Sequence, residues 1–202
     1  MADTVEKTPS QAKRDQILRA AELEFQEHGF AITNMDRISA RAGVSKRTVY
    51  KYFESKEKLF KELIAGHWGR FAESLDVTYE KGRDIRAQLI ELGQAEGRLL
   101  TSPEVMATTR MVMSELLRSP ELVEETQAKT DFKVSFEEML RAADADGQLS
   151  IEDPRQAAEE FISLIKGKAF WPVVFGAPVV TRDEMSALIE SSVEMMMRRY
   201  AP

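Results

Sequence analysis

The side chains with the clearest chemistry are cations and tyrosines gathered in one short segment. Within Arg37–Lys58 the sequence holds seven Lys or Arg residues against two Glu. Lys46, Arg47 and Tyr50 follow closely on Gly43. Lys and Arg can donate hydrogen bonds to O6 and N7 of guanine, and Arg can use two nitrogens at once. Residues of these types, so placed, indicate a surface that reads DNA bases.

A helix-turn-helix spanning Thr33 to Leu59 would position these side chains. Thr33 and Ser45 are the expected N-caps of two short helices, because their hydroxyls can accept from free backbone amides. Gly43 suits the turn, since glycine tolerates positive φ. In this motif the first turn of the second helix enters the major groove. Lys46 and Arg47 would lie there.

Composition limits the alternatives. The whole chain of 202 residues has a net charge of −6, yet residues 1–60 hold eleven Lys or Arg and nine Asp or Glu. An acidic protein with one basic end has the charge layout of a modular nucleic-acid binder. It has no cysteine, which excludes disulfides, thiol catalysis and thiolate zinc sites. The apolar run 169–180 is too short and too broken by Pro and Gly to span a bilayer.

Helical periodicity and helix-end signals run along the whole chain, and no alternating stretch is long enough for a sheet. We therefore predict an all-α protein with a flexible end at 1–10, a helix-turn-helix domain at 11–57 and a helical regulatory and dimerisation domain at 58–202. The expected elements are nine helices, at about 9–29, 33–42, 45–53, 55–81, 85–100, 103–118, 120–143, 154–170 and 181–200.

The basic segment resembles the DNA-binding domain of the TetR family of bacterial transcription regulators. The resemblance covers about 50 residues, from Lys13 to Phe60, with uninterrupted spacing. The matching positions are Gly29-Phe30, Thr33, Ile38, Ala42-Gly43-Val44-Ser45, Thr48-Val49-Tyr50, Tyr52-Phe53, Ser55-Lys56-Glu57 and Leu59. Many members carry a small residue where this chain has Arg47, so the sequence departs from the family there.

The family resemblance implies a homodimer that binds a roughly palindromic double-stranded operator, usually as a repressor, and that is released by a small effector, here unknown. It implies a bacterial, cytoplasmic, DNA-associated protein with no cofactor and no membrane partner. Carried over by position, the base-reading residues are Asn34, Lys46, Arg47 and Tyr50. The phosphate-holding residues are Thr33, Thr48, Tyr52 and Lys56. The alternative for the cations is an ordinary solvated helix face, and for Tyr50 a packing role.

Two broadly apolar helices near the end of the chain predict a partner surface. In the family, the last two helices form a four-helix bundle with those of the partner. The expected interface residues are Phe161, Ile162, Ile165, Leu188, Ile189 and Met196. The alternative is that these side chains complete the core of one protomer. The segment Phe170–Gly176 resembles an AefR-like subgroup of the family.

An effector pocket would lie between the fourth and seventh helices. Aromatic, Met and polar side chains at helical spacing form the expected lining: His67, Trp68, Phe71, Met106, Arg110, Met111, Met113, Phe132 and Phe136. Such residues adapt to varied apolar ligands. Met and Phe at this spacing are also common core residues, so that alternative stays open.

Besides a ligand-responsive repressor, the sequence leaves two other functions to compare. The first is a DNA-binding adaptor of the same fold whose C-terminal domain binds a protein, and a sealed interior would favour it. The second is an enzyme, which the sequence argues against because it pairs no nucleophile with a base. We also expect no metal site: the loop at Asp144–Asp146 resembles a calcium loop, but Ala142 takes its first ligand position.

Overall fold

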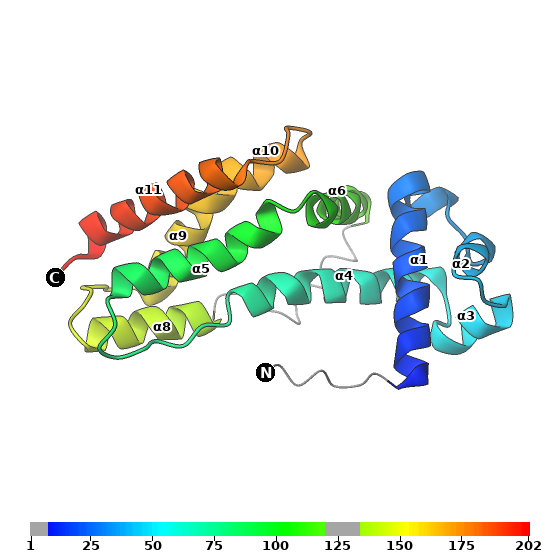
Figure 1. The fold of residues 1–202 in the computed structure, drawn as a ribbon, viewed down its shortest axis with the longest axis horizontal. Helices are drawn as coiled ribbons and strands as arrows, with labels where there is room; N and C mark the ends of the chain where they lie inside the picture. Colours follow the sequence, from blue (N-terminus) through cyan, green and yellow to red (C-terminus); the bar gives the residue numbers. More distant parts are fainter. Residues whose placement is uncertain (1–7, 120–133) are drawn as a thin grey trace. The chain divides into compact units, whose positions relative to one another are not determined.

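A computed structural model describes residues 8–119 and 134–202, and these form helices without any strand (Figure 1). The elements are α1 (Pro9–Ile32), α2 (Met35–Arg41), α3 (Lys46–Tyr52), α4 (Lys56–Ser74), α5 (Ile85–Leu100), α6 (Pro103–Arg118), α8 (Val134–Ala145), α9 (Pro154–Ala169), α10 (Trp171–Val174) and α11 (Arg182–Tyr200). The predicted all-α class is confirmed. Within these residues, no helix combines the length and the apolar character needed to cross a membrane.

The chain divides into two compact units. Of the described residues, 8–66 and 111–119 belong to the first unit, and 67–110 and 134–202 belong to the second. The expected domain boundary at residue 57 lies nine residues before the observed division at Gly66. The observed division falls inside α4, because Lys56–Ser74 is one uninterrupted helix that contributes residues to both units.

The first unit packs α1, α2, α3 and the start of α4 around aromatic rings. The ring of Phe25 lies 5.6 Å from that of Phe30 and 5.1 Å from that of Phe60, measured between centroids. Ile38 and Val49, the inward residues of α2 and α3, are fully buried. Buried apolar side chains of this size each contribute about 1.5–3 kcal/mol, so the short helices are held by packing.

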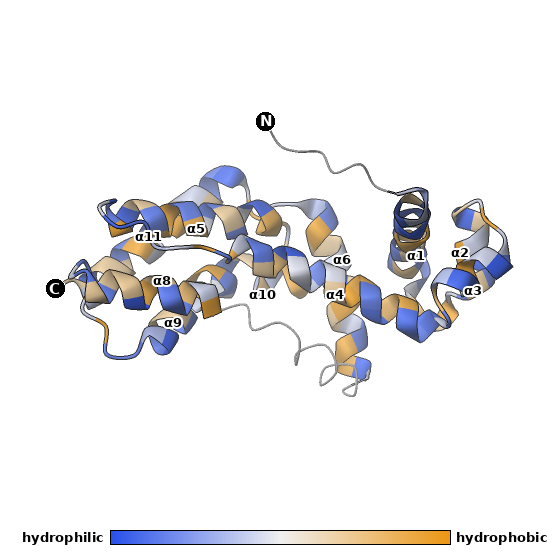
Figure 2. Ribbon diagram, turned by 90° about the horizontal axis from the view of Figure 1, so that it is seen from below, coloured by the Kyte–Doolittle hydropathy of each residue, from blue (hydrophilic) through white to orange (hydrophobic). Residues whose placement is uncertain are grey.

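In the second unit, α5 lies close against α11. A Cβ on Gly93 would come within 2.7 Å of Ile189, and one on Gly97 within 2.9 Å of Met185. Glycine weakens an isolated helix, but here its missing side chain lets two helices approach. Figure 2 shows that the helices of this unit carry both hydrophilic and hydrophobic residues, as expected for elements with one buried face.

Helix α4 ends at Ser74 and not near Lys81 as expected. The segment after it is held by side chains instead of by helical hydrogen bonds. The Tyr79 hydroxyl donates to Asp146 Oδ2 at 2.7 Å, and Lys81 Nζ lies 2.9 Å from Asp146 Oδ1. A partner 67 residues away in the chain therefore fixes Tyr79, which local periodicity could not indicate.

Three other boundaries differ from expectation. Asn34, and not Thr33, caps α2. Of the helix expected at 120–143, residues 120–133 lie outside the described residues, and the described residues from Val134 form α8, which ends at Ala145. The four-residue α10 follows α9 directly and was not expected. The other helices agree with the prediction to within about three residues at each end.

Candidate functional site

The helix-turn-helix of the first unit is fixed by local and tertiary hydrogen bonds. Gly43 has a φ of 60°, the left-handed region expected of glycine in this turn. The Ser45 hydroxyl accepts from the Thr48 amide and caps α3. From α1, the Gln16 side chain donates to the Ala42 carbonyl at 2.7 Å. The turn is thus held from both α3 and α1.

The expected base-reading side chains on α3 are exposed. Lys46, Arg47 and Tyr50 all reach solvent, and Tyr50 has an exposed fraction of 45%. Because Tyr50 lies outside the core, the packing alternative is not supported by its position. Asn34 is also exposed, but its Oδ1 accepts from the Asp36 and Arg37 amides as the N-cap of α2.

The expected phosphate-holding residues are not equivalent. Thr33 is 1% exposed and its hydroxyl donates to the Glu24 carbonyl at 3.0 Å. The predicted phosphate contact of the Thr33 side chain is therefore corrected to a structural hydrogen bond. The Thr48 hydroxyl lies 2.8 Å from that of Ser45, and the Tyr52 hydroxyl lies 3.3 Å from that of Ser10. Thr48 and Tyr52 remain accessible at the surface.

Lys56 also has a partner within the protein. Its Nζ donates to the Phe30 carbonyl at 2.7 Å and lies 4.2 Å from the centroid of the Phe30 ring. A cation over an aromatic face is attracted by the ring quadrupole. Lys56 thereby ties the start of α4 to the end of α1, which is a structural role in addition to the predicted phosphate contact.

A buried carboxylate accounts for two more cations of the basic segment. Glu24 is 4% exposed, and its oxygens accept from Arg37 at 2.8 Å and from Arg41 at 2.6 Å. Burial favours the neutral form of Glu24, but the two guanidinium groups outweigh it and lower the pKa of this carboxyl. Arg41 also pairs with Glu27. These arginines hold α2 on α1.

The charge that remains available is therefore smaller than the sequence indicates. Lys46 pairs with Asp36 and Lys58 with Glu54. Arg47 and Lys51 are both exposed, and their side chains form no ion pair or hydrogen bond with another of the described residues. Of the base-reading candidates, Arg47 is thus the cation with no competing partner described.

Glu24, Glu27 and His28 could in principle hold a metal ion, since one ligand atom from each lies within 4.8 Å of the others. Both carboxylates already pair with Arg41, and Glu24 pairs with Arg37 as well. Two adjacent guanidinium charges oppose a cation at this position. The residues do not fit a metal site.

The expected effector-binding residues do not form one lining. His67, Phe71, Met106 and Phe136 are 0–3% exposed, and apart from His67 they belong to the hydrophobic core of the second unit. Trp68 packs against that core. Arg110 is exposed, with Nη1 3.5 Å from the Val173 carbonyl. Met111 and Met113 are part of the first unit, and Phe132 lies outside the described residues.

His67 is one of the buried polar residues of the second unit. Its Nε2 lies 2.9 Å from the Thr109 hydroxyl, and Arg70 Nη2 lies 3.1 Å from its Nδ1. The Thr109 hydroxyl donates to the Val105 carbonyl, so His67 donates to Thr109 through Nε2 and accepts at Nδ1. Burial, with the charge of Arg70, lowers the pKa of His67 to about 4. The imidazole is therefore neutral at physiological pH.

A buried carboxylate of the same unit, Glu96, pairs with the half-buried Lys166 and was not identified from the sequence. Glu96 is 1% exposed, and its Oε1 lies 3.5 Å from Lys166 Nζ without a hydrogen bond. Burial raises the pKa of Glu96, and Lys166 opposes this only in part. Glu96 continues the apolar row of Leu89, Leu92 and Leu100 on α5, and this position is the signal that could have identified it.

The expected dimer-interface residues lie inside the protomer. Phe161, Ile162, Ile165, Ile189 and Met196 are 0–5% exposed, and Leu188 is partly buried against the same core. The burial of these five side chains favours the alternative, completion of the protomer core, because both helices direct their apolar stripes into it. Of the five, Met196 also lines an open groove between the two helices.

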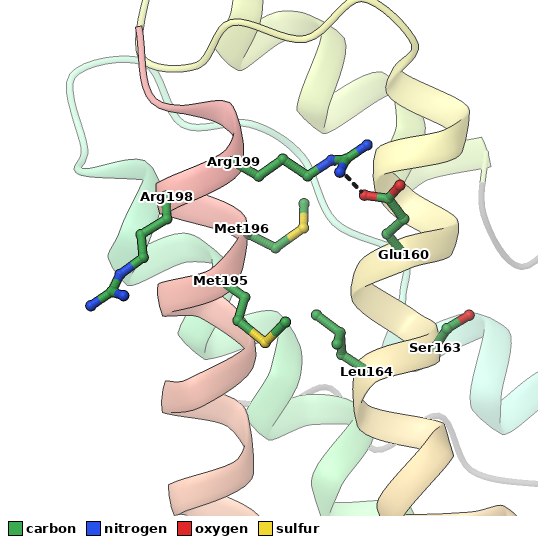
Figure 3. A pocket seen from close by; sticks show the side chains of 7 residues that line it. All are labelled: Glu160, Ser163, Leu164, Met195, Met196, Arg198 and Arg199. Carbon is green, nitrogen blue, oxygen red and sulfur yellow. Dashed lines mark ion pairs between the residues drawn. The ribbon is translucent and has the colours of Figure 1, made fainter.

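A different face of the same two helices is open. A groove of about 670 Å³ lies between α9 and α11 (Figure 3). Its lining residues are Glu160, Ser163, Leu164, Met195, Met196, Arg198 and Arg199. Met195 is 53% exposed, and Arg199 Nε lies 3.1 Å from Glu160 Oε2 across the groove. Apolar side chains bordered by polar and charged ones are the composition of a protein-contact surface.

Two family descriptions match the chain. Residues 17–63 match bacterial regulatory proteins of the tetR family, and residues 87–202 match the C-terminal domain of AefR-like transcriptional repressors. The first match contains the helix-turn-helix. The second covers more than half of the chain, and agrees with the subgroup indicated by Phe170–Gly176.

Several known proteins are similar to this chain. A TetR-family regulator from Pseudomonas syringae pv. tomato shares 39% identity, with a TM-score of 0.81 over 94% of this chain and 97% of that one. The flavonoid-responsive regulator FrrA shares 30% identity, with a TM-score of 0.72 over 95% and 98%. The repressor AcnR of Corynebacterium efficiens is 27% identical over 187 residues, 89% of this chain and 92% of that protein. The activator FasR of Mycolicibacterium smegmatis is 38% identical over 81 residues, which span 40% of this chain and 37% of that protein.

Proposed function

Because this chain belongs to the TetR family of DNA-binding transcriptional regulators, we propose that it is a homodimeric repressor that binds a palindromic operator and is released by a small effector. The observation that carries the proposal is the exposure of Lys46, Arg47 and Tyr50 on α3, within a helix-turn-helix held by α1. Arg47 would donate to guanine, and Lys46 and Tyr50 would lie beside it. Asn34, Thr48 and Tyr52 would approach the same duplex from the surface of this unit.

The DNA-binding part of the proposal is tested by footprinting the purified protein on the DNA flanking its own gene. A protected site with two related half-sites is expected, with centres one helical turn or a multiple of it apart. Transcription from the flanking promoter should fall when the protein is added. Absence of any protected sequence would contradict operator binding, and stimulated transcription would contradict repression.

For the dimer, we propose that the face of α9 and α11 that carries this groove packs against the same face of a second copy. A two-fold interface must match itself. Here Leu164 and Met195 offer apolar area, while Glu160 and Arg198 at the surface offer charges of opposite sign. Met195 is a large apolar residue exposed on α11, with the exposed polar residues Ser191, Arg198 and Arg199 one turn away, and Met is enriched at interfaces.

This dimer is tested by Met195→Glu, which places a charge on the apolar part of the groove. The expected result is a monomer in analytical ultracentrifugation and a loss of cooperative binding to the two half-sites. Leu117→Glu is the matched control, since Leu117 is 74% exposed on α6 of the other unit; this variant should remain dimeric. A Met195→Glu dimer of unchanged affinity would place the interface elsewhere.

The effector is proposed to act on the second unit by shifting its conformational equilibrium, since a ligand changes DNA affinity only if it binds one state better. The name of FrrA ties a relative to flavonoids, and a polar ligand inside this unit would have to exchange with the hydrogen bonds that His67 makes to Thr109 and Arg70. A compound panel that includes flavonoids should contain members that raise the melting temperature and release the operator. Compounds that bind without changing operator affinity would contradict this mechanism.

The adaptor alternative keeps one supporting observation. Phe71, Met106 and Phe136 are packed in the core, as a sealed interior would require. If no compound of the panel stabilises the protein, and a protein bound to the second unit changes operator affinity, the adaptor replaces the effector-released repressor.

A further inference from the structure

An ion pair joins the two helices of the helix-turn-helix at the end where α3 begins. Lys46 Nζ lies 2.7 Å from Asp36 Oδ1. Asp36 is the second residue of α2 and Lys46 is the first residue of α3. Both side chains are exposed, with exposed fractions of 65% and 56%. Asn34 caps α2 through the Asp36 amide, so the backbone that carries the carboxylate is fixed.

This pair differs from the other ion pairs of the basic segment. Glu24 uses Arg37 and Arg41 to hold α2 on α1, and its carboxylate is buried. Among the described contacts, the Asp36 carboxylate pairs with Lys46 alone, and Lys46 is a base-reading candidate. The Asp36 carboxylate therefore pairs with the Lys46 ammonium on the surface that would face DNA in the proposed function.

A lysine ammonium on its flexible four-carbon stem discriminates poorly between base pairs when nothing restrains its position. It can turn to any nearby phosphate, and phosphate contacts carry no sequence information. An ammonium has three N–H donors. If Asp36 accepts one of them, two remain for a base edge, and the stem is held away from the backbone. The carboxylate also removes one unit of positive charge from this surface, which weakens binding to every sequence.

We propose that Asp36 is a specificity-determining positioning residue: it orients Lys46 toward one base pair and prevents its use as a general phosphate contact. The favoured partner base is guanine, whose O6 and N7 can accept the two remaining N–H groups. This inference rests on the proposed function, because it requires that the start of α3 enters the major groove. Asp36 itself contacts no base in this arrangement and acts through Lys46.

The test uses the full-length protein and a duplex obtained by selection from a random double-stranded library. The dissociation constants are measured for the selected duplex and for a scrambled duplex of equal composition, over a series of salt concentrations. For Asp36→Asn we expect tighter binding to scrambled DNA, a salt slope steeper by about one, and a specificity ratio about tenfold lower. Repeated selection with the variant should lose preference at one base pair of each half-site.

Three further variants make the outcome decisive. Glu54→Gln removes one charge from a comparable exposed pair, that of Glu54 with Lys58, and should leave base preference unchanged. In a Lys46→Met background, Asp36→Asn should no longer change base preference. Asp36→Glu should restore the preference, and melting curves of all variants check folding.

Three results would overturn the inference. Asp36→Asn could keep the wild-type preference, Glu54→Gln could relax it equally, or Asp36→Asn could relax it in the Lys46→Met background as well. Failure of the proposed function looks different, because the wild-type protein would then select no sequence from the library at all.

Discussion

Lys56 Nζ donates to the carbonyl of Phe30 at 2.7 Å and stands 4.2 Å from the centre of its ring. The two residues join the start of α4 to the end of α1, so this lysine is part of the packing of the first unit. A lysine that matches a phosphate-holding position of the family thus has a structural partner before any DNA is bound.

We predict that Lys56→Met lowers the free energy of unfolding by about 1–2 kcal/mol, from the lost hydrogen bond and cation–ring attraction. Chemical denaturation measures this change. Lys51→Met is the control, because Lys51 is exposed with no described partner, and it should have little effect. If Lys56→Met is as stable as wild type and only flattens the salt dependence of DNA binding, Lys56 is a phosphate contact and no more.

Arg47→Ala should relax base preference, since Arg47 is an exposed cation of α3 without a described partner. The expected loss on the selected operator is about 1–3 kcal/mol, with much less loss on scrambled DNA. Competition binding against single-base variants of the operator measures the effect. Lys51→Ala, on the same helix, should weaken binding to all duplexes by a similar amount, and this amount should be smaller than the loss that Arg47→Ala causes on the operator. An equal loss of base discrimination in both variants would show that Arg47 reads no base.

Gly93→Ala should destabilise the second unit although alanine is the better helix former. A Cβ there would lie 2.7 Å from Ile189 Cγ2, and overpacking of this kind costs about 1–3 kcal/mol against a gain in helix propensity of about 1 kcal/mol. Gly66→Ala has open space around its Cβ and should stabilise by up to about 1 kcal/mol. Urea denaturation of both variants measures the difference; stabilisation by Gly93→Ala would mean that α5 and α11 are not held this closely.

Glu96 should make stability depend on pH in a defined direction. Because burial raises its pKa above the reference of 4.5, the folded protein binds this proton more tightly than the unfolded chain does. Stability from this group is then highest below pH 4.5 and falls as pH rises through the folded-state pKa. Glu96→Gln cannot lose a proton, so melting temperatures of the variant relative to wild type should increase across that window.

The comparison with Glu96→Gln cancels the other carboxyl groups, which titrate in both proteins. Glu190→Gln, at an exposed position of α11, should give a melting curve parallel to that of wild type at every pH. If the melting temperature of Glu96→Gln also runs parallel to that of wild type as pH changes, Lys166 fully offsets the cost of burying the Glu96 carboxylate.

The sequence by itself determined the all-α class, most helix boundaries and the family, because these depend on neighbours along the chain. The capping boxes at Thr8 and Thr181 and the turn at Gly43 lie where local hydrogen bonding requires them. The TetR resemblance rests on a contiguous segment, and the matches over residues 17–63 and 87–202 confirm it.

Only the tertiary structure decided which side chains remain free to act. The Thr33 hydroxyl donates to the Glu24 carbonyl. The Lys56 ammonium donates to the carbonyl of Phe30, which lies 26 residues before it in the chain. The apolar rows of α9 and α11 point into the protomer, and Met195 does not. Helical periodicity shows that a row of side chains shares a face. Whether this face meets the protein's own core, a partner or DNA depends on groups brought together from distant parts of the chain.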